Sequence, residues 1–459
     1  MKTGAIILAA GKGTRMHSSL PKVLHQVCGK AMVQLIIDNI RAAEIGKSYI
    51  VIGHGAEQVK ETLGADHAYA VQEPQLGTGH CVMQALPIIP EDTDGVLVVC
   101  GDTPLLRQET LANLKEHFLQ TGAACTILTA KMADPGGYGR VLRNADGKII
   151  GIVEEKDATP EQKQITEVNT GTYFFSYPLL KKALAQLTNN NAQGEYYLTD
   201  TLAYLNANGY TIDGILSQDA DETMGVNDRV QLAKADRLLR QRKNRQLMQE
   251  GVTLIDPSNT YIDLDVEIGQ DTIIYPNCHL RGNTKIGQNC LVDADCQITD
   301  SIIGDHCHLT KAIIKESTIG DYGEIGPFAY IRPKTQVRDH VKIGHFVEVK
   351  KSTVDDGTKI PHLSYIGDAV IGKEVNIGCG TITCNYDGAN KFQTLIGDHV
   401  FIGSNSNLVA PVEIEENAYV AAGSTITKKV SKDALAIARA RQQELKGWVP
   451  AKAPKKNKK

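Results

Sequence analysis

The sequence lacks any long apolar run, and its charge balance excludes further classes of protein. The apolar stretch at residues 5–10, AIILAA, is far shorter than the roughly 20 residues that cross a bilayer, and GKGTR follows it directly. The formal net charge is only -4, which gives no general case for nucleic-acid binding. We therefore expect a cytoplasmic protein with no membrane segment and no nucleic-acid partner, and we expect the basic end of the chain, AKAPKKNKK, to be solvated.

Cysteine pairs with the spacing of a zinc site are also missing. None of the 10 cysteines belongs to a CxxC pair, so we do not expect structural zinc or a thiol-based redox site. Cys278, Cys290 and Cys296 instead occupy interior positions of the repeat described next, and we interpret them as small buried thiols. With 459 residues, 42% of them hydrophobic and 22% charged, the chain is expected to form two or more globular domains.

An aliphatic residue returns every six positions through the second half of the chain. The series includes Ile262, Ile268, Ile274, Leu280 and Ile286, shifts its register before Ile319, and continues to Ile426. A period of six fits neither a helix nor a single strand, but it fits three short strands joined by tight corners and repeated every eighteen residues. Residues eighteen apart should then lie one above the other at strand spacing, roughly 4.8 Å.

Apolar strand patterns alternate with helical patterns in the first half of the chain. This alternation predicts a doubly wound, mostly parallel sheet, in which ligands bind at the carboxyl ends of the strands. The polar, helix-forming stretch that follows is interpreted as a linker. We therefore expect a first domain over residues 1–229, a helical linker over 230–250 and a second domain over 251–459.

Three loops at the expected carboxyl ends of strands carry candidate binding residues. The first is LAAGKGTRMHSSLPK, which runs from Leu8 to Lys22. Gly11 and Gly13 allow backbone N–H groups to converge on an anion, while Arg15 and Lys22 add positive charge. The loop matches neither the Rossmann fingerprint nor the Walker loop, so its residues by themselves leave open both a phosphate-binding loop and a structural turn.

The second loop is QEPQLGTGH. Gln72 offers both a donor and an acceptor to the edge of a base, and Gly77 with Thr78 permits close backbone approach. An ordinary helix entry would have the same composition, so both interpretations stay open for this loop.

The third loop follows the fully apolar strand pattern of VVCGDTPLL. It places Asp102 at the carboxyl end of a buried strand, where a carboxylate suits a hard cation that bridges phosphates. The alternative is a helix N-cap two residues before Pro104.

The position just after the inward aliphatic residue is usually glycine, but Arg332 and Lys350 occupy it in two coils. Arg332 and Lys350 are eighteen residues apart and should lie one above the other, which predicts a site for a phosphate because stacked like charges destabilise a sheet unless an anion separates them. His345 and His362 both follow an inward aliphatic by two positions, and either could serve as a base at neutral pH. Their positions alone do not choose between them.

The motifs of the first half resemble the signature of the sugar-1-phosphate nucleotidyltransferases. The resemblance implies that the first loop wraps a triphosphate, that Gln72 reads uracil, and that Asp102 holds Mg²⁺ together with Asn227 in MGVND. It assigns catalysis to Lys22 and Arg15, which neutralise developing charge. Nucleotide and sugar binding are assigned to Leu8, Ala9, Ala10, Gly11, Lys22, Gln72, Gly77, Thr78, Gly139, Glu154, Asn169 and Asn227.

The repeat resembles the left-handed parallel β-helix of the hexapeptide-repeat acyltransferases, and its handedness is taken from that family. The resemblance implies that His362 is the base and that the coils associate as a homotrimer. It assigns the acetyl acceptor to Arg332, Lys350, Tyr365 and Asn376, and acetyl-CoA to Cys379, Asn385, Tyr386, Ser404, Ala422 and Arg439. Cys379 stands where alanine is usual, but contacts there would come from the backbone.

Both halves, in this order, resemble one family of bifunctional enzymes of bacterial cell-envelope precursor synthesis. Members would acetylate glucosamine-1-phosphate from acetyl-CoA and then transfer uridylyl from UTP to N-acetylglucosamine-1-phosphate, giving UDP-N-acetylglucosamine and pyrophosphate. Two alternatives are a pyrophosphorylase whose coil only oligomerises and a scaffold without enzymatic activity. The intact first loop with Asp102 disfavours the scaffold, and His362 near two stacked cations disfavours the single-activity enzyme.

Overall fold

The computed structural model describes residues 1–449, which form two compact units that divide between Arg242 and Lys243. The solvated tail expected at AKAPKKNKK lies outside the described residues. Among those described, no helix is both long enough and apolar enough to span a membrane.

Unit 1 is built on a nine-stranded sheet. Its main path runs β11-β7-β10-β6-β1-β4-β5, with β8 and β9 attached beside β10. Strand β10 is antiparallel to β6 and β7, whereas the other pairs along the path are parallel. The strands are β1 (Thr3–Ala9), β4 (Lys47–Ile52), β5 (Ala68–Val71), β6 (Gly95–Cys100), β7 (Cys125–Lys131), β8 (Arg140–Arg143), β9 (Ile149–Val153), β10 (Glu167–Ser176) and β11 (Ile212–Leu216); a separate hairpin pairs β2 (Gln26–Val27) with β3 (Lys30–Ala31).

Helices cover both faces of this sheet. They are α1 (Met32–Ala42), α2 (Ala56–Leu63), α3 (Thr78–Ala85), α4 (Gln108–Thr121), α5 (Tyr177–Leu184) and α6 (Asp200–Ala207). Ile6 packs in a core with α3, α5 and α6, and its neighbour Ile7 packs in a second core with α1, α2 and α4. Both side chains are fully buried, which stabilises each face by about 1.5–3 kcal/mol per residue. The doubly wound, mostly parallel sheet expected from the sequence is confirmed.

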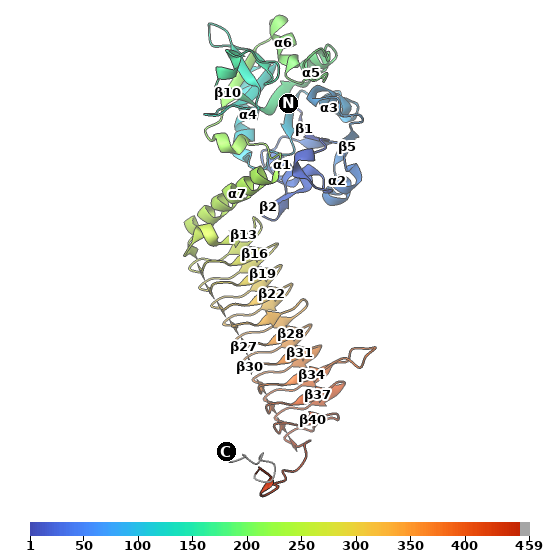
Figure 1. The fold of residues 1–459 in the computed structure, drawn as a ribbon, viewed down its shortest axis with the longest axis vertical. Helices are drawn as coiled ribbons and strands as arrows, with labels where there is room; N and C mark the ends of the chain where they lie inside the picture. The colour runs from blue at the N-terminus through green and yellow to red at the C-terminus, as the bar shows by residue number, and fades with distance from the viewer. Residues whose placement is uncertain (450–459) are drawn as a thin grey trace, which may run out of the picture. The chain divides into compact units, whose positions relative to one another are not determined.

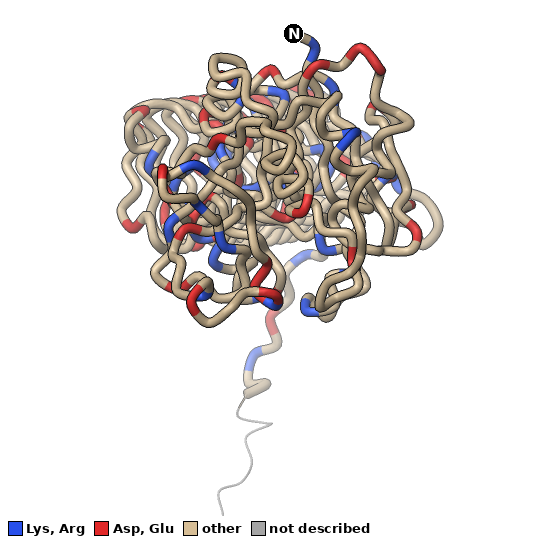
Figure 2. Tube along the Cα trace, turned by 90° about the horizontal axis from the view of Figure 1, so that it is seen from above, with Lys and Arg blue, Asp and Glu red and all other residues tan. Residues whose placement is uncertain are grey.

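Charges of both signs are mixed on unit 1. Figure 2 shows Lys and Arg interspersed with Asp and Glu along the visible trace. Several of these residues pair, as in the contact of the Arg143 guanidinium with both carboxylate oxygens of Glu167 at 2.7 and 2.8 Å.

Helix α7 (Arg229–Gln249) follows unit 1's last strand in sequence, and the division between the two units falls within it.

Unit 2 is a coil of three parallel sheets around one apolar core, and Figure 1 shows its strands stacked coil upon coil. Face 1 contains β12 (Thr253–Leu254), β15 (Ile273–Ile274), β18 (Leu291–Val292), β21 (His308–Leu309), β24 (Glu324–Ile325), β27 (Lys342–His345), β30 (Lys359–His362), β33 (Asn376–Ile377), β36 (Phe401–Ile402), β39 (Tyr419–Val420) and β41 (Leu435–Ala436). Face 2 contains β13 (Tyr261–Ile262), β16 (His279–Arg281), β19 (Gln297–Thr299), β22 (Ile313–Lys315), β25 (Tyr330–Ile331), β28 (Glu348–Lys350), β31 (Tyr365–Gly367), β34 (Ile382–Cys384), β37 (Asn407–Val409) and β40 (Thr425–Ile426). Face 3 contains β14 (Glu267–Ile268), β17 (Lys285–Ile286), β20 (Ile302–Ile303), β23 (Thr318–Ile319), β26 (Gln336–Val337), β29 (Thr353–Val354), β32 (Ala369–Ile371), β35 (Thr394–Ile396) and β38 (Val412–Ile414).

The eighteen-residue register holds for some coils and shortens in others. Tyr330 lies beside Glu348, eighteen residues on, but Gln297 lies beside Ile313, only sixteen residues on. Corners that lack a residue explain the shift of register seen in the sequence. Cys278, Cys290 and Cys296 are buried in the core, as expected.

One loop leaves the coil between β34 and β35. It covers residues 385–393 and is held by an isolated bridge between Tyr386 and Lys391. Figure 1 shows it projecting from the stacked strands near β34. The six-residue repeat is therefore interrupted at this loop.

Candidate active sites

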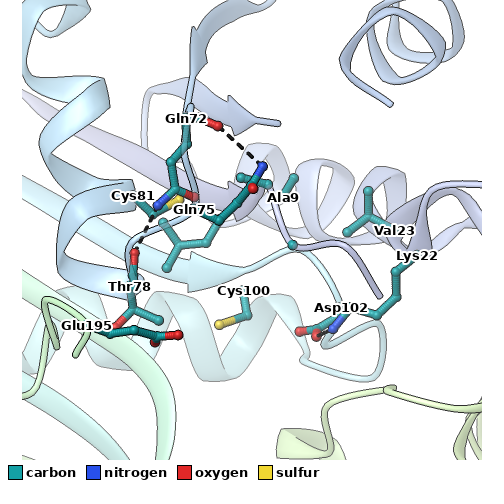
Figure 3. A pocket seen from close by; sticks show the side chains of 14 residues that line it. Ala9, Lys22, Val23, Gln72, Gln75, Thr78, Cys81, Cys100, Asp102 and Glu195 are labelled. Carbon is teal, nitrogen blue, oxygen red and sulfur yellow. Dashed lines mark hydrogen bonds and ion pairs between the residues drawn. The ribbon is translucent and has the colours of Figure 1, made fainter. Parts of the chain in front are cut away.

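The first candidate site lies at the carboxyl ends of three parallel strands. Strands β1, β5 and β6 end at Ala9, Val71 and Cys100, and a cavity of about 250 Å³ opens among the loops that follow them. It is lined by Leu8, Ala9, Ala10, Gly11, Lys22, Val23, Gln72, Gln75, Gly77, Thr78, Cys81, Cys100, Asp102 and Glu195. In Figure 3 the Lys22–Asp102 pair lies on one side of the cavity, and Gln72 and Thr78 lie on the other.

The glycines of the first loop allow Lys22 to fold back toward the cavity. Gly13 has φ 59°, and a Cβ added there would lie 2.7 Å from the Cβ of Lys22, so this position requires glycine. Gly11 lines the cavity. Arg15, in the short 3₁₀ helix η1 (Thr14–Met16), is exposed and does not line it. The structure thus brings Lys22 to the cavity and leaves Arg15 at the surface of the loop.

Lys22, Asp102 and Asn227 meet although they are far apart in sequence. The Lys22 ammonium forms an ion pair with Asp102 and lies 3.2 Å from Oδ1 of Asn227. The Val226 N–H donates to the Asp102 carbonyl at 2.8 Å, which fixes the MGVND segment beside the end of β6. The helix N-cap interpretation of Asp102 gains no support, because α4 begins at Gln108 and its N-cap is Arg107.

The oxygens around Lys22 suit a hard cation. A carboxylate and an amide oxygen converge on one positively charged group, and Mg²⁺ prefers oxygen ligands of this kind. Within residues 1–449 no cluster of three or more His, Cys, Asp or Glu side chains forms a metal site. Asp102 and Asn227 therefore fit a hard cation such as Mg²⁺.

Gln72 is held at the opposite side of the cavity. It follows β5 directly, is only 3% exposed, and its Nε2 donates to the Gly77 carbonyl at 3.0 Å. Gly77 has φ 104°, and a Cβ there would lie 2.7 Å from the Tyr196 carbonyl oxygen. Helix α3 begins at Thr78, which agrees with both interpretations of the QEPQLGTGH loop: it is a helix entry, and it lines the cavity.

Gly139, Glu154 and Asn169 come together at the ends of β8, β9 and β10. A Cβ on Gly139 would lie 3.3 Å from Oε2 of Glu154 and 3.5 Å from Cβ of Asn169. The Thr199 hydroxyl donates to Oε1 of Glu154 at 3.0 Å. Burial raises the pKa of Glu154, and this hydrogen bond partly opposes the rise. The cluster offers carboxylate and amide groups able to bind sugar hydroxyls.

Several cavity residues were not among those predicted from the sequence. Gln75 lies within the QEPQLGTGH loop and Cys81 directly follows it, so their place in the sequence was a usable signal. Glu195 comes from a distant segment, which the Gly79 N–H ties to α3 through the Tyr196 carbonyl at 2.8 Å. Cys100 ends β6, and burial raises its pKa to about 12, so its thiol is not nucleophilic near neutral pH.

The second candidate site lies on face 2 of the coil. Arg332 and Lys350 follow the paired inward residues Ile331 and Val349, so they occupy equivalent positions in adjacent coils, as expected. A carboxylate that the sequence reasoning did not include lies beside Arg332. Glu348 pairs with Arg332 at 2.7 Å.

Further charged groups surround Lys350. Asp368 lies 3.9 Å from its ammonium. The Lys350 ammonium lowers the pKa of the loop residue Lys391. Tyr365 precedes the inward residue Ile366 on the same face. The protein thus supplies carboxylates of its own, while two ammonium groups stay close enough to repel each other.

The two candidate histidines form a stacked pair. His345 and His362 are seventeen residues apart, lie in register on β27 and β30, and their ring centroids are 5.7 Å apart. Both are exposed at the corner between face 1 and face 2. His362 ends strand β30 of face 1, and Tyr365, three residues later, begins strand β31 of face 2. His362 therefore lies next to the start of face 2.

The proposed acetyl-CoA residues extend the column of the histidines. Cys379, Ser404 and Ala422 each follow an inward residue of face 1 by two positions, as His362 does, and the Asn405 N–H donates to the Cys379 carbonyl at 2.7 Å. A Cβ on Gly423 would lie 3.9 Å from Cδ of Arg439. One edge of the coil therefore carries these four residues together.

The remaining candidate residues are divided between two faces. Asn385 is buried and donates to Asp368 at 2.6 Å, while Tyr386 is 58% exposed on the projecting loop. Asn376 instead lies on face 1, in register with Lys359 and Phe401. The structure therefore places Asn376 on a different face of the coil from Arg332, Lys350 and Tyr365.

These two sites define a two-domain transferase, with a nucleotidyltransferase unit followed by a hexapeptide-repeat coil. The model of the MobA-like NTP transferase domain matches residues 5–197, and that of the bacterial transferase hexapeptide (six repeats) matches residues 265–299 and 393–428. The fold class expected from the sequence, including the left-handed β-helix, is confirmed.

Curated relatives place the chain within one family. It is 52% identical over 453 residues to the bifunctional protein GlmU of Clostridium beijerinckii, covering 98% of this chain and 99% of the relative. It is 51% identical over 457 residues to that of a Geobacillus species, covering 100% of both chains, and 50% identical over 455 residues to that of Clostridioides difficile, covering 99% of both. The chain belongs to the GlmU family of bifunctional transferases. The prediction of an enzyme with two transferase activities is confirmed.

Proposed function

We propose that this chain acetylates glucosamine-1-phosphate from acetyl-CoA and then transfers uridylyl from UTP to the N-acetylglucosamine-1-phosphate formed, releasing pyrophosphate. The observation that carries the uridylyl step is the convergence of Lys22, Asp102 and Asn227 beside one cavity. The product, UDP-N-acetylglucosamine, supplies peptidoglycan and other cell-envelope precursors. Residues 1–229 and 251–459 carry the two activities, and residues 230–250 join them.

In the uridylyl step, a phosphate oxygen of the sugar phosphate attacks the α-phosphorus of UTP as the bond to pyrophosphate breaks. Lys22 lies at the cavity and neutralises charge there, whereas Arg15 must reach the phosphates from the exposed part of its loop. Gln72, Gly77 and Thr78 bind the nucleotide. Asp102 and Asn227 would hold Mg²⁺, which would supply positive charge to offset that of the phosphates.

The sugar cluster supports the choice of acceptor in this step. Glu154 and Asn169 offer hydrogen-bond acceptors and donors to hydroxyl and amide groups, and Gly139 leaves space between them. Leu8, Ala9, Ala10 and Gly11 line the cavity that holds Gln72 and Thr78, whereas Gly139, Glu154 and Asn169 lie outside its lining. Gly139, Glu154 and Asn169 bind the N-acetylglucosamine ring. The nucleotide is bound by Leu8, Ala9, Ala10 and Gly11.

In the acetyl step, His362 removes a proton as the amine of glucosamine-1-phosphate attacks the thioester carbonyl, and the coenzyme A thiolate leaves. Arg332 and Lys350 bind the phosphate of this substrate, and Lys391 is close enough to Lys350 to share it. Tyr365 binds the sugar from face 2. Asn376 lies on face 1, so its contact with the same sugar would have to come from another subunit of the proposed homotrimer. Acetyl-CoA lies along the column formed by Cys379, Ser404 and Ala422, with Asn385, Tyr386 and Arg439 beside it.

The coils associate as a homotrimer, and the enzyme works in the cytoplasm on these small molecules without binding membrane or nucleic acid. Hexapeptide repeats in the chain support oligomer formation. Sedimentation equilibrium of the purified chain tests the trimer: a mass three times that of the monomer is expected, and a monomer at micromolar concentration would contradict it.

Two assays of the purified chain test the proposed activities separately. Pyrophosphate release from UTP and N-acetylglucosamine-1-phosphate should require Mg²⁺, and free thiol should appear from acetyl-CoA only when glucosamine-1-phosphate is added. His362→Ala should abolish most thiol release and spare pyrophosphate release. Loss of both activities in that variant while the protein stays folded would contradict the separation of the two sites.

A further inference from the structure

The side-chain amide of Gln72 is oriented by groups behind the cavity. Its Nε2 lies 3.0 Å from the Gly77 carbonyl, an atom that can only accept, so this amide atom must be the nitrogen. The same Nε2 lies 3.2 Å from Nδ1 of His80. Its two hydrogens therefore have two partners, provided that Nδ1 of His80 carries no proton.

His80 lies between two glutamine amides that make competing demands. On its other side, Nε2 of Gln84 lies 3.1 Å from Nε2 of His80 and 3.2 Å from the His80 carbonyl. A neutral imidazole accepts at one nitrogen and donates at the other, so it cannot accept from both amides. One of the two glutamines must turn its oxygen toward the ring.

Burial decides which glutamine turns. Gln72 is 3% exposed, and reversing its amide would set its oxygen against the Gly77 carbonyl oxygen. Gln84 is only partly buried, and reversing it loses one bond to a helix carbonyl. Gln84 therefore accepts from Nε2–H of His80, and Nδ1 is left to accept from Gln72.

The oxygen of Gln72 is then available to a ligand. Within residues 1–449 no group donates to Oε1 of Gln72. This atom is also not one of the buried side-chain oxygens that lack a hydrogen-bond partner in that part of the chain. Gln72 lines the cavity, whereas His80 does not. We infer that His80 is a positioning residue that, together with the Gly77 carbonyl, holds the Gln72 amide with its oxygen toward the base, so that the site selects a base with an N–H donor at its edge.

This inference rests on the proposed binding of uracil at Gln72. Uracil presents N3–H, a donor, whereas cytosine has an unprotonated N3, an acceptor, at the same position. An acceptor oxygen fixed in the cavity pairs with N3–H of uracil and repels the unprotonated N3 of cytosine. A buried hydrogen-bonding mismatch of this kind changes affinity by roughly 10- to 100-fold. A Gln72 amide that could rotate freely would satisfy either base.

Equilibrium binding of UTP and CTP to the full chain, measured by titration calorimetry, tests this role. The variants are His80→Ala, which removes the acceptor at Nδ1, and His80→Asn, whose Oδ1 replaces it at the same distance from the backbone. His117→Ala is the control, because it removes a partly buried histidine of the same unit that pairs with Asp213 at 2.8 Å. Circular dichroism checks that each variant is folded.

We expect the wild type and the His117 variant to prefer UTP by about 10- to 100-fold, and His80→Asn to stay within about threefold of the wild type. His80→Ala should lose at least about fivefold of the preference, because only the Gly77 carbonyl is left to hold the Gln72 amide. Full preference in folded His80→Ala would overturn the inference, and so would equal loss in His80→Asn. Turnover is measured separately. A wild type that prefers UTP without releasing pyrophosphate would contradict the proposed uridylyl transfer but support this role of His80.

Discussion

Removing the carboxylate of Asp102 should weaken unit 1 as well as its chemistry. The side chains of Lys22 and Asp102 are only 15% and 17% exposed, and the remaining partner of Lys22 is Oδ1 of Asn227 at 3.2 Å. Breaking a buried ion pair costs about 3–5 kcal/mol. Because this pair keeps some exposure, we expect Asp102→Ala to lower the free energy of unfolding by roughly 2–3 kcal/mol. That loss corresponds to a fall in Tm of about 4–12 °C for a domain of this size.

A second variant separates the unpaired charge from general damage. Lys22→Met combined with Asp102→Ala removes both charges, so most of the lost stability should return. Differential scanning calorimetry of the full chain measures both variants, and the transition of unit 1 is the one that UTP raises. The reasoning is wrong if Asp102→Ala leaves Tm unchanged, or if the double variant is at least as unstable as Asp102→Ala. Asp102→Ala should also impair Mg²⁺-dependent pyrophosphate release while acetyl transfer persists.

Three further predictions concern the sites and their separation. His362→Ala should slow acetyl transfer by ~10²- to 10⁴-fold with partial rescue at high pH, and His345→Ala should do far less; the reverse order in thiol-release assays would show that the stacked ring His345 is the base. A chain ending at Arg242, where unit 1 ends, should still release pyrophosphate from UTP and N-acetylglucosamine-1-phosphate but lack acetyl transfer, and a folded, inert fragment would show that unit 1 is not self-sufficient. Burial raises the pKa of Glu154 in the folded state, so folding favours its protonated form and the stability it contributes falls as pH rises above the unfolded pKa. Glu154→Gln should therefore raise Tm relative to the wild type more at pH 7 than at pH 4, and an equal difference at both pH values in calorimetry would contradict this.

The repeat was the most predictable part of the fold, because each coil must bury one aliphatic residue per strand. Ile331 and Val349 lie in register eighteen residues apart, as the period requires. The coils of sixteen and seventeen residues could be located only as a shift in the series, since the length of a corner depends on backbone turns that the period does not specify. The doubly wound sheet followed equally well from its alternating apolar strands.

The candidate sites were predictable where a residue directly follows a strand. Asp102 and Gln72 are of this kind, because the ends of parallel strands meet at one edge of the sheet. Glu195 was not predictable, because only tertiary packing brings its segment to the cavity. The same holds for the face on which Asn376 lies, which depends on the position of each corner.

The orientation of hydrogen-bonding groups was beyond any sequence pattern. The arrangement of Gln72, His80 and Gln84 depends on three distances and on which amide is more buried. Likewise, the carboxylates of Glu348 and Asp368 beside the two cations were not expected, although Glu348 precedes Lys350 by only two residues.

The most direct test of the two-step function is a time course with one purified protein. The full chain is mixed with glucosamine-1-phosphate, acetyl-CoA, UTP and Mg²⁺, and products are followed by mass spectrometry, with a parallel reaction that omits UTP. We expect N-acetylglucosamine-1-phosphate to appear first and then to be converted to UDP-N-acetylglucosamine, while the reaction without UTP stops at the acetylated sugar phosphate. Formation of UDP-glucosamine before any acetylated product, or no acetylated sugar phosphate in either reaction, would contradict the proposed sequence of steps.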